Sequence, residues 1–313
     1  IGRGAASGYI NLISKLPTRD GVNMLTAGVG TASKLRATAD LNQAIGETSA
    51  IRLNAMVSDG DVDKRDVVEN QSYAIAPSFA TGLGTPTRFY LFSQHVRQDN
   101  VPDGGISALG FRGLYIAPSY STTVGGVTTV TQNAATEALA SAIMNAPKVD
   151  RSNYYGSTGD HEDVSADMVT AKFEHDLDSK TTIRNTSRYG KTSMDRVMNG
   201  TSIPSVSANT VNPANPAYLD PNDPSSWTFT PIRQRVDRVN EILANQTTLN
   251  TEFSTGAVKH TFAGGLEFMW ERQKNRTFAT NAQTINGVAY AATVNPATSY
   301  YNPDPSVVRG MPY

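Results

Sequence analysis

Apolar and polar residues alternate along many stretches of this chain, a pattern typical of β-strands that keep one face apolar. In the stretch from 35 to 42, the residues expected on one face are Leu35, Ala37, Ala39 and Leu41. Those expected on the opposite face are Arg36, Thr38, Asp40 and Asn42. The alternation recurs around residues 51–58, 72–79, 169–174 and 262–271. The sequence therefore predicts an all-β fold of amphipathic strands.

The alternation predicts nine strands, at residues 22–33, 34–45, 50–60, 69–82, 86–98, 162–177, 180–195, 240–255 and 259–275. Several are longer than the ~5–6 residues usual in globular sheets and suit a tilted strand that crosses a bilayer in ~9–11 residues. Short polar turns join some neighbours, whereas residues 98–160, 198–238 and 276–313 form long loops. Short turns at one end and long loops at the other indicate an antiparallel transmembrane β-barrel of the bacterial outer membrane.

A soluble β-sandwich or propeller would also show alternating strands. The lengths of the strands and the asymmetry of the loops favour the barrel, and so does a polar second face that carries Arg36, Asp40, Arg52, Lys172, Glu174 and Arg184. Residues 133–148 interrupt the alternation with apolar residues at helical spacing, so we expect a short helix that packs the long loop onto itself.

The residue types give little sign of catalysis or of metal binding. The chain has no cysteine, and its four histidines lack any metal-ligand spacing. Residues 59–70 begin like a calcium-binding loop but do not match its pattern, because Lys64 stands where glycine is needed and Asn70 where glutamate is needed. A net charge of −1 gives no reason to expect nucleic acid. We therefore expect no enzyme, no metal site and no bound cofactor.

Basic and aromatic residues on the long loops are the candidate ligand contacts. Arginine and exposed rings suit a planar, anionic ligand through charge-assisted hydrogen bonds and stacking, although packing within the loops would explain the same residues. The candidates are Arg97, Arg112, Tyr115, Tyr120, Arg151, Tyr154, Tyr155, Trp227 and Arg233.

The first residues of the chain resemble the end of the plug domain of TonB-dependent siderophore receptors. The resemblance rests on a G-R-G-x-x-x-G-x-I-N run whose residues here are Gly2, Arg3, Gly4, Gly8, Ile10 and Asn11. Further shared stretches are Asp40-Leu41-Asn42, Arg52-Leu53-Asn54, Ala76-Pro77-Ser78 and Pro102-Asp103-Gly104-Gly105. Others are most similar to the catecholate siderophore receptors, among them Lys148-Val149-Asp150, Asn153-Tyr154-Tyr155-Gly156, Phe173-Glu174-His175-Asp176, Thr182-Ile183-Arg184-Asn185-Thr186 and Ile242-Leu243-Ala244-Asn245-Gln246-Thr247.

The resemblance implies a barrel of about 22 strands with an N-terminal plug inside it. We expect the chain to be a fragment, with the last plug strand in residues 1–20 and the first part of the barrel in residues 21–313. The whole protein would be a monomer in the outer membrane of a Gram-negative bacterium. It would bind a ferric siderophore, of catecholate type, and import it with energy from TonB, so iron would be carried as cargo.

Two other functions stay open at this point. The receptor could take a different cargo, such as another siderophore, a vitamin or a sugar. The chain could also belong to a structural or adhesive barrel of the outer membrane that transports nothing.

Overall fold

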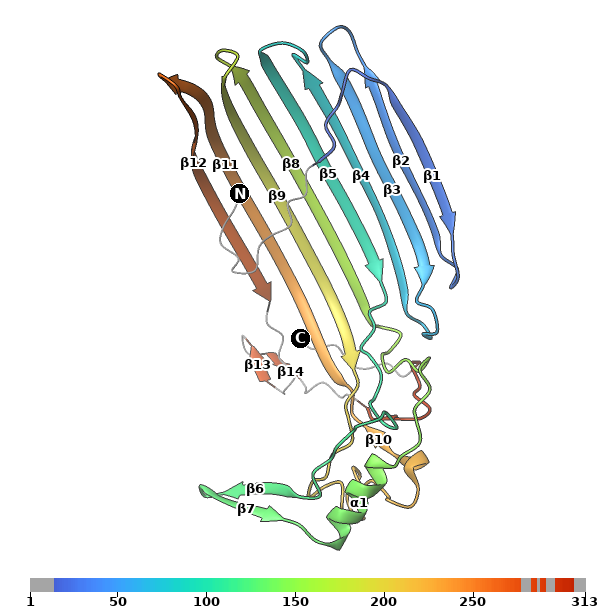
Figure 1. Cartoon of the computed structure of the whole chain (residues 1–313). Coiled ribbons are helices and arrows are strands. Elements are labelled where there is room, and N and C mark those ends of the chain that lie inside the picture. Colours follow the sequence, from blue (N-terminus) through green and yellow to red (C-terminus); the bar gives the residue numbers. More distant parts are fainter. Residues whose placement is uncertain (1–13, 277–282, 286–287, 291–295, 307–313) are drawn as a thin grey trace.

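The computed structural model describes residues 14–276, 283–285, 288–290 and 296–306, and its main feature is a nine-stranded antiparallel sheet (Figure 1). The strands are β1 (Val22–Val29), β2 (Leu35–Ala44), β3 (Ala50–Asp61), β4 (Glu69–Thr81), β5 (Thr87–Asn100), β8 (His161–Asp176), β9 (Thr181–Gly200), β11 (Ile232–Thr255) and β12 (Val258–Arg276). Each pairs with the next of these in chain order. The nine predicted strands are thus confirmed in this part of the chain. The motif from Gly2 to Asn11 lies outside the described residues.

Two strands are longer than the sequence predicts. β9 continues to Gly200 and β11 begins at Ile232, where these two residues pair with each other. The sequence predicts limits at residues 195 and 240, because regular alternation of apolar residues stops there. The extra pairs are carried by the backbone ladder, which needs no apolar face. The loop that joins the two strands is correspondingly shorter.

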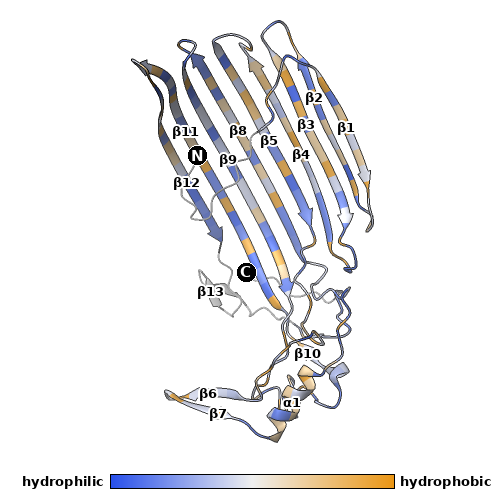
Figure 2. Cartoon of the chain, in the orientation of Figure 1, coloured by the Kyte–Doolittle hydropathy of each residue, from blue (hydrophilic) through white to orange (hydrophobic). Residues whose placement is uncertain are grey.

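The two faces of the sheet differ in chemistry, as the alternating colours along each strand in Figure 2 show. We call the inner face the one crossed by residues 15–20, where the Lys15 ammonium lies 2.7 Å from Asp40 and the Arg52 guanidinium donates to the Leu16 carbonyl oxygen. Asn42, 1% exposed, donates to the backbone carbonyls of Thr18 and Asp20. Arg52 is also paired with Asp40 at 2.7 Å. This network fixes residues 15–20 against β2 and β3.

The opposite, outer face carries an apolar band of solvent-exposed side chains, among them Leu25, Leu41, Ile51, Val57, Ile75, Leu91, Val169, Leu243 and Leu266. Aromatic rings mark its limits, with Tyr189 and Trp270 toward the long loops and Phe89 paired with Phe173 near the short turns. An outward apolar band with aromatic residues at both borders is what a barrel presents to a membrane.

Four polar side chains interrupt this band between β9 and β11. Asn185 donates to the side-chain oxygens of Asn245, at 3.2 Å, and Thr247, at 2.7 Å. Asn245 donates in return to Asn185, at 3.1 Å, and to Ser187, at 2.8 Å. Both carboxamide NH₂ groups therefore use both of their hydrogens inside the cluster. We call these four residues the amide cluster.

The long loops fold together into a compact unit beyond one end of the sheet (Figure 1). This loop subdomain comprises residues 101–160, 201–231 and 296–306 and contains β6 (Tyr120–Val124), β7 (Val127–Thr131), α1 (Ala134–Met144), η1 (Pro224–Ser226), β10 (Thr228–Phe229) and β15 (Thr298–Ser299). A separate short hairpin joins β13 (Gln283–Ile285) and β14 (Val288–Tyr290). The helix predicted at 133–148 is confirmed as α1, which Asn133 caps by accepting hydrogen bonds from the backbone of Ala135 and Thr136. Among the described residues, no helix has the length and apolar character needed to cross a membrane.

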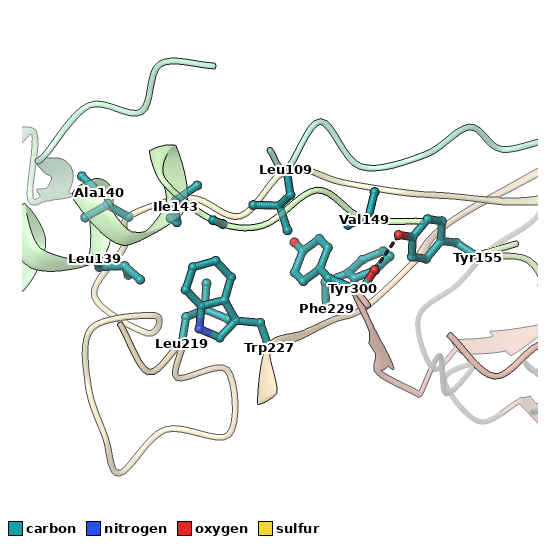
Figure 3. Packing of buried hydrophobic residues seen from close by; sticks show 12 residues of the cluster. Leu109, Leu139, Ala140, Ile143, Val149, Tyr155, Leu219, Trp227, Phe229 and Tyr300 are labelled. Atoms are coloured by element: carbon teal, nitrogen blue, oxygen red, sulfur yellow. Dashed lines mark hydrogen bonds between the residues drawn. The ribbon is translucent and has the colours of Figure 1, made fainter. Parts of the chain in front are cut away.

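The loop subdomain has its own hydrophobic core, shown in Figure 3. α1 contributes Leu139 and Ile143, both 1% exposed or less, so the helix does pack the loop onto itself. The rings of Phe229 and Tyr300 stack at 4.4 Å between centroids. Trp227 is fully buried, and its indole nitrogen donates to the Asp220 carbonyl oxygen at 2.7 Å.

Buried tyrosines make this core sensitive to high pH. Burial raises the pKa of Tyr300 to about 12, because the phenolate would lie without water in an apolar environment. The pKa of Tyr155, whose hydroxyl donates to the Tyr300 carbonyl oxygen at 2.6 Å, is raised by burial as well. A raised pKa in the folded state contributes stability below the unfolded value, and this contribution is lost as the pH rises through the folded value.

We therefore expect the loop subdomain to open between about pH 10 and 12. Ionisation of Tyr300 should contribute roughly 3 kcal/mol to the loss in its free energy of unfolding. The measurement is tyrosinate absorbance followed together with protease cleavage of residues 201–231. Tyr300→Phe should move the opening to higher pH, since it removes one titrating group. Titration of all tyrosines near pH 10, without any new protease cleavage of residues 201–231, would contradict this expectation.

Candidate functional site

A hollow of about 640 Å³ lies on the inner face of the sheet. Its floor is one row of paired residues across neighbouring strands, in which Met168 lies opposite Gly190 and Gly190 opposite Ile242. The row ends in a polar residue on each side, Gln94 of β5 and Glu271 of β12. The volume lies within the range of ~300–1,000 Å³ of small-molecule sites, which are mostly apolar with a few polar groups.

Gly190 creates the hollow because it has no side chain. It is buried, and a Cβ atom added there would lie 3.1 Å from the Cγ2 atom of Ile242. Any larger side chain at this position would have to occupy the space above the floor. A methionine next to this gap gives a polarizable surface suited to the face of an aromatic ring.

One rim of the hollow is held in place by a chain of side-chain hydrogen bonds. Asn240 donates to Thr192 at 3.3 Å, and Gln273 donates to Asn240 at 2.8 Å. The side chains of Gln94 and Glu271, at the two ends of the floor, have no hydrogen-bond or ion-pair partner among the described residues. They are the polar groups that remain available to a ligand.

The inner wall toward the short turns is rich in cations. The Glu174 carboxylate, 6% exposed, is paired with Lys172 at 2.8 Å and with Arg184 at 2.6 Å. Arg88 lies 3.3 Å from Glu174 and 2.6 Å from Asp176. Arg188, which pairs with Ala244 beside the hollow, donates to the Thr170 hydroxyl at 3.1 Å. Glu267, in the same row of paired residues as Lys172, and Glu271 at the floor add two carboxylates, so cations and carboxylates balance over wall and floor together. Arg188 is the cation of this group with no carboxylate partner among the described residues, and it is therefore the group best placed to pair with an anion.

The candidate residues from the sequence fall into three groups. Arg97 and Arg233 are not on loops, because β5 and β11 extend over them; Arg97 lies on the outer face and pairs with Asp167 at 3.0 Å. Tyr154, Tyr155 and Trp227 are at most 2% exposed and form part of the packing of the loop subdomain. On the surface of the loop subdomain lie Arg112, Tyr115 and Arg151, with half-buried Tyr120 in β6.

Sequence reasoning missed the hollow altogether. The alternation places Met168 and Ile242 on the polar-lined face of their strands, and this signal could have marked them as unusual. Their meeting beside Gly190 depends on the pairing register of several strands, which a single sequence does not contain. Among the described residues, no group of three or more histidines or carboxylates could hold a metal ion.

Comparison with known proteins gives a consistent set of relatives. The catecholate siderophore receptor Fiu of Escherichia coli K12 is 38% identical over 309 residues, which is 99% of this chain and 35% of that protein. BfrD of Bordetella pertussis, named a probable TonB-dependent receptor, is 31% identical over 315 residues, covering 98% of this chain and 36% of that protein. The chain thus spans about a third of the length of the curated relatives that it matches. No protein-family model matches the sequence.

Solved structures of siderophore receptors share the fold of this chain. The closed form of the ferric-catecholate import receptor Fiu from Escherichia coli superposes with a TM-score of 0.80 at 36% identity, over 100% of this chain and 38% of that one. The siderophore receptor PiuA from Acinetobacter baumannii, at 22% identity and a TM-score of 0.67 over 94% of this chain and 38% of that one, shows the same fold. The sheet is therefore part of a larger antiparallel β-barrel.

Proposed function

Because the chain belongs to the TonB-dependent siderophore receptors, we propose that the receptor containing it binds a ferric siderophore of catecholate type and imports it across the outer membrane of a Gram-negative bacterium. TonB would supply the energy. The apolar band on the outer face supports contact with outer-membrane lipid. The cargo chelates its own iron, so iron would pass through the receptor as part of the cargo.

The hollow on the inner face is the single observation that most supports this cargo. A ferric catecholate is an anion that carries flat aromatic rings. The floor of Met168, Gly190 and Ile242 would contact a ring, while the Arg188 guanidinium beside the hollow would pair with the anion. On the loop subdomain, Arg112, Tyr115 and Arg151 are exposed and would make the first contacts from outside the cell.

We also propose the division of the chain at residue 20, with the end of the plug before it and the barrel after it. The hydrogen bonds of residues 15–20 to Asp40, Asn42 and Arg52 support this division. They would tie the end of a plug to the wall of the barrel that surrounds it.

Filling the hollow tests the proposed site. We expect Gly190→Leu in the full receptor to weaken binding of a ferric catecholate at least tenfold, because losing ring contacts worth about 1.4 kcal/mol changes affinity by that factor. Gly28→Leu is the matched control, since Gly28 lies on the same face in β1 and a Cβ atom there would meet nothing within 4 Å. Binding and uptake of the iron-labelled complex are the measurements. Equal affinity in the two variants and the wild type would remove the hollow from the site.

The loop contact has a separate test. We expect Arg112→Ala to weaken binding several-fold while the barrel still assembles, and Arg112→Lys to restore part of the loss, since lysine keeps the charge without the planar donor fork. Titration with several kinds of ferric chelate distinguishes a catecholate cargo from another siderophore. Wild-type affinity in Arg112→Ala would direct attention to the part of the receptor that precedes this chain.

A further inference from the structure

The connection between β3 and β4, residues 62–68, carries an arginine whose side chain is held by the loop subdomain. Arg65 is 11% exposed, and its Nε and Nη2 atoms donate to the two carboxylate oxygens of Asp103 at 2.9 and 2.7 Å. Its Nη1 atom donates to the Arg151 carbonyl oxygen at 2.6 Å. Asp103 follows β5 and Arg151 precedes β8. One guanidinium therefore joins the two ends of the long loop that spans residues 101–160.

The Asp103 side of this contact is fixed to the sheet. A Cβ atom added to the next residue, Gly104, would overlap the Asn199 carbonyl oxygen at the end of β9, so only glycine allows the two backbones to lie this close. The Gly105 N–H donates to the Asp103 carboxylate at 2.8 Å. The position of Arg65 is thus set by β9 as well as by its own neighbours β3 and β4.

The other side of the contact is a turn with Arg151 at its centre. The Asp66 N–H donates to the Ser152 carbonyl oxygen at 2.8 Å, and the Ser152 N–H donates to the Asp150 carboxylate at 2.8 Å. With the bond from Arg65, the backbone is held at Arg151 and at the residue after it. The Arg151 side chain is exposed, and its guanidinium has no hydrogen-bond or ion-pair partner among the described residues. The turn therefore holds its backbone firmly and leaves one cation available to a ligand.

The connection of residues 62–68 adopts a costly backbone conformation to make these contacts. Lys64 and Val67 have φ of 58° and 66°, in the left-handed region that is unfavourable for residues with a Cβ atom and most of all for a β-branched one. Val67 is 47% exposed, so burial of its own side chain does not offset this cost. Such conformations persist where surrounding contacts hold them, and they are frequent at functional sites. The hydrogen bonds of Arg65 and Asp66 to the loop subdomain are contacts of this kind.

We propose that Arg65 is a positioning residue for cargo binding, which acts by holding the Arg151 turn ready for an anionic ligand. This inference rests on the proposed function and deepens it, because it says how one of the candidate contacts is kept in place. A guanidinium pairs well with negatively charged oxygen atoms only when its planar fork is correctly oriented. A turn that is already ordered loses less conformational freedom when the ligand binds, so its contacts contribute more to affinity.

Trypsin tests the state of the turn without any cargo, because Arg151 is itself a cleavage site. In the full receptor, Arg65→Gln should make cleavage after Arg151 about tenfold faster, since proteolysis requires local opening of the chain. Lys64→Gln is the matched control, because Lys64 is the neighbouring cation, is exposed and has no ion-pair partner among the described residues. Cleavage after Arg112, in the same subdomain, should keep its wild-type rate in both variants. In the described part of the chain, the core of the loop subdomain includes no residue from 62–68.

Titration with a ferric tris-catecholate complex tests the effect on binding. We expect Arg65→Gln and Arg151→Gln each to weaken binding about tenfold, as the loss of a charge-assisted contact predicts. The double variant should bind less than about twofold more weakly than Arg151→Gln alone, because Arg65 acts through Arg151. Arg65→Lys should keep part of the affinity, since lysine retains the charge beside Asp103 but lacks the fork that also reaches the Arg151 carbonyl oxygen.

Three results would each overturn the proposal. They are an unchanged rate of cleavage after Arg151 in Arg65→Gln, wild-type affinity in Arg151→Gln, and losses of affinity that add in the double variant. A merely structural role of Arg65 would give that additive result. Failure of the proposed function is a different observation, because the wild-type receptor itself would then bind no ferric catecholate. The cleavage rates would still show in that case whether Arg65 holds the turn.

Discussion

Trp227→Ala should unfold the loop subdomain and leave the nine-stranded sheet intact. Trp227 is fully buried among residues of the loop core, and its indole N–H donates to the Asp220 carbonyl oxygen. Truncation of a buried tryptophan to alanine usually costs about 3–5 kcal/mol, which is a large share of the stability of a unit this small. The loss would stay local, because the sheet is held by its own ladder of strand pairs.

Limited proteolysis of the full receptor is the measurement for this variant. We expect rapid cleavage within residues 101–160 and 201–231, together with normal heat-dependent migration of the barrel in gels. Trp270→Ala is the control, since the chain has two tryptophans and Trp270 lies 44% exposed on the outer face of β12. Loops that stay resistant in Trp227→Ala would show that the core of the loop subdomain does not depend on this ring.

The second large effect is expected in the amide cluster of the outer face. Asn185→Leu would leave one Asn245 N–H without its acceptor and the Asn245 carboxamide oxygen without its donor, while Ser187 would still accept from the second N–H. Both unsatisfied groups would lie in the apolar outer face of the sheet. An unsatisfied buried polar group costs about 1–3 kcal/mol. The double variant Asn185→Leu/Asn245→Leu should be more stable than either single variant, because it removes both partners together.

A double-mutant cycle on the full barrel in lipid vesicles measures this coupling. Urea unfolding of the wild type, both single variants and the double variant gives the interaction free energy. Additive losses, with the double variant the least stable of the four, would mean that the amides do not act as a pair. The residues flanking the cluster on the same strands, Tyr189 and Leu243, stay unchanged in all four proteins.

The sequence predicts the sheet well, since its strands obey one simple rule. Alternation locates all nine strands, and the apolar members Leu35, Ile51, Tyr73, Val169 and Phe262 do lie on the outer face. The rule fails where neither face is apolar. For this reason it predicts that β9 ends before Gly200 and that β11 begins after Ile232, so both strands are predicted too short. It also leaves the hairpin of β6 and β7 unrecognised inside a long loop, although the Gly-Gly pair between two valines is a turn signal.

Candidate contacts are harder to predict than strands. Residue type points to Tyr155 and Trp227, yet the structure buries both in the core of the loop subdomain, since large rings serve packing as readily as binding. The hollow depends on Gly190, a residue whose importance lies in the absence of a side chain. Only the register between β8, β9 and β11 brings its floor together.

β5 and β8 are neighbours in the sheet, yet residues 101–160 separate them in the chain. The loop of residues 101–160 therefore leaves the sheet at the end of β5 and returns to it at the start of the neighbouring strand β8. Since loop-closure entropy grows only slowly with length, such an insertion can be lengthened, shortened or exchanged at little cost to the wall. Related receptors can therefore differ in the loop subdomain through exchange of residues 101–160 alone. The strands of the barrel and their pairing stay unchanged by such an exchange.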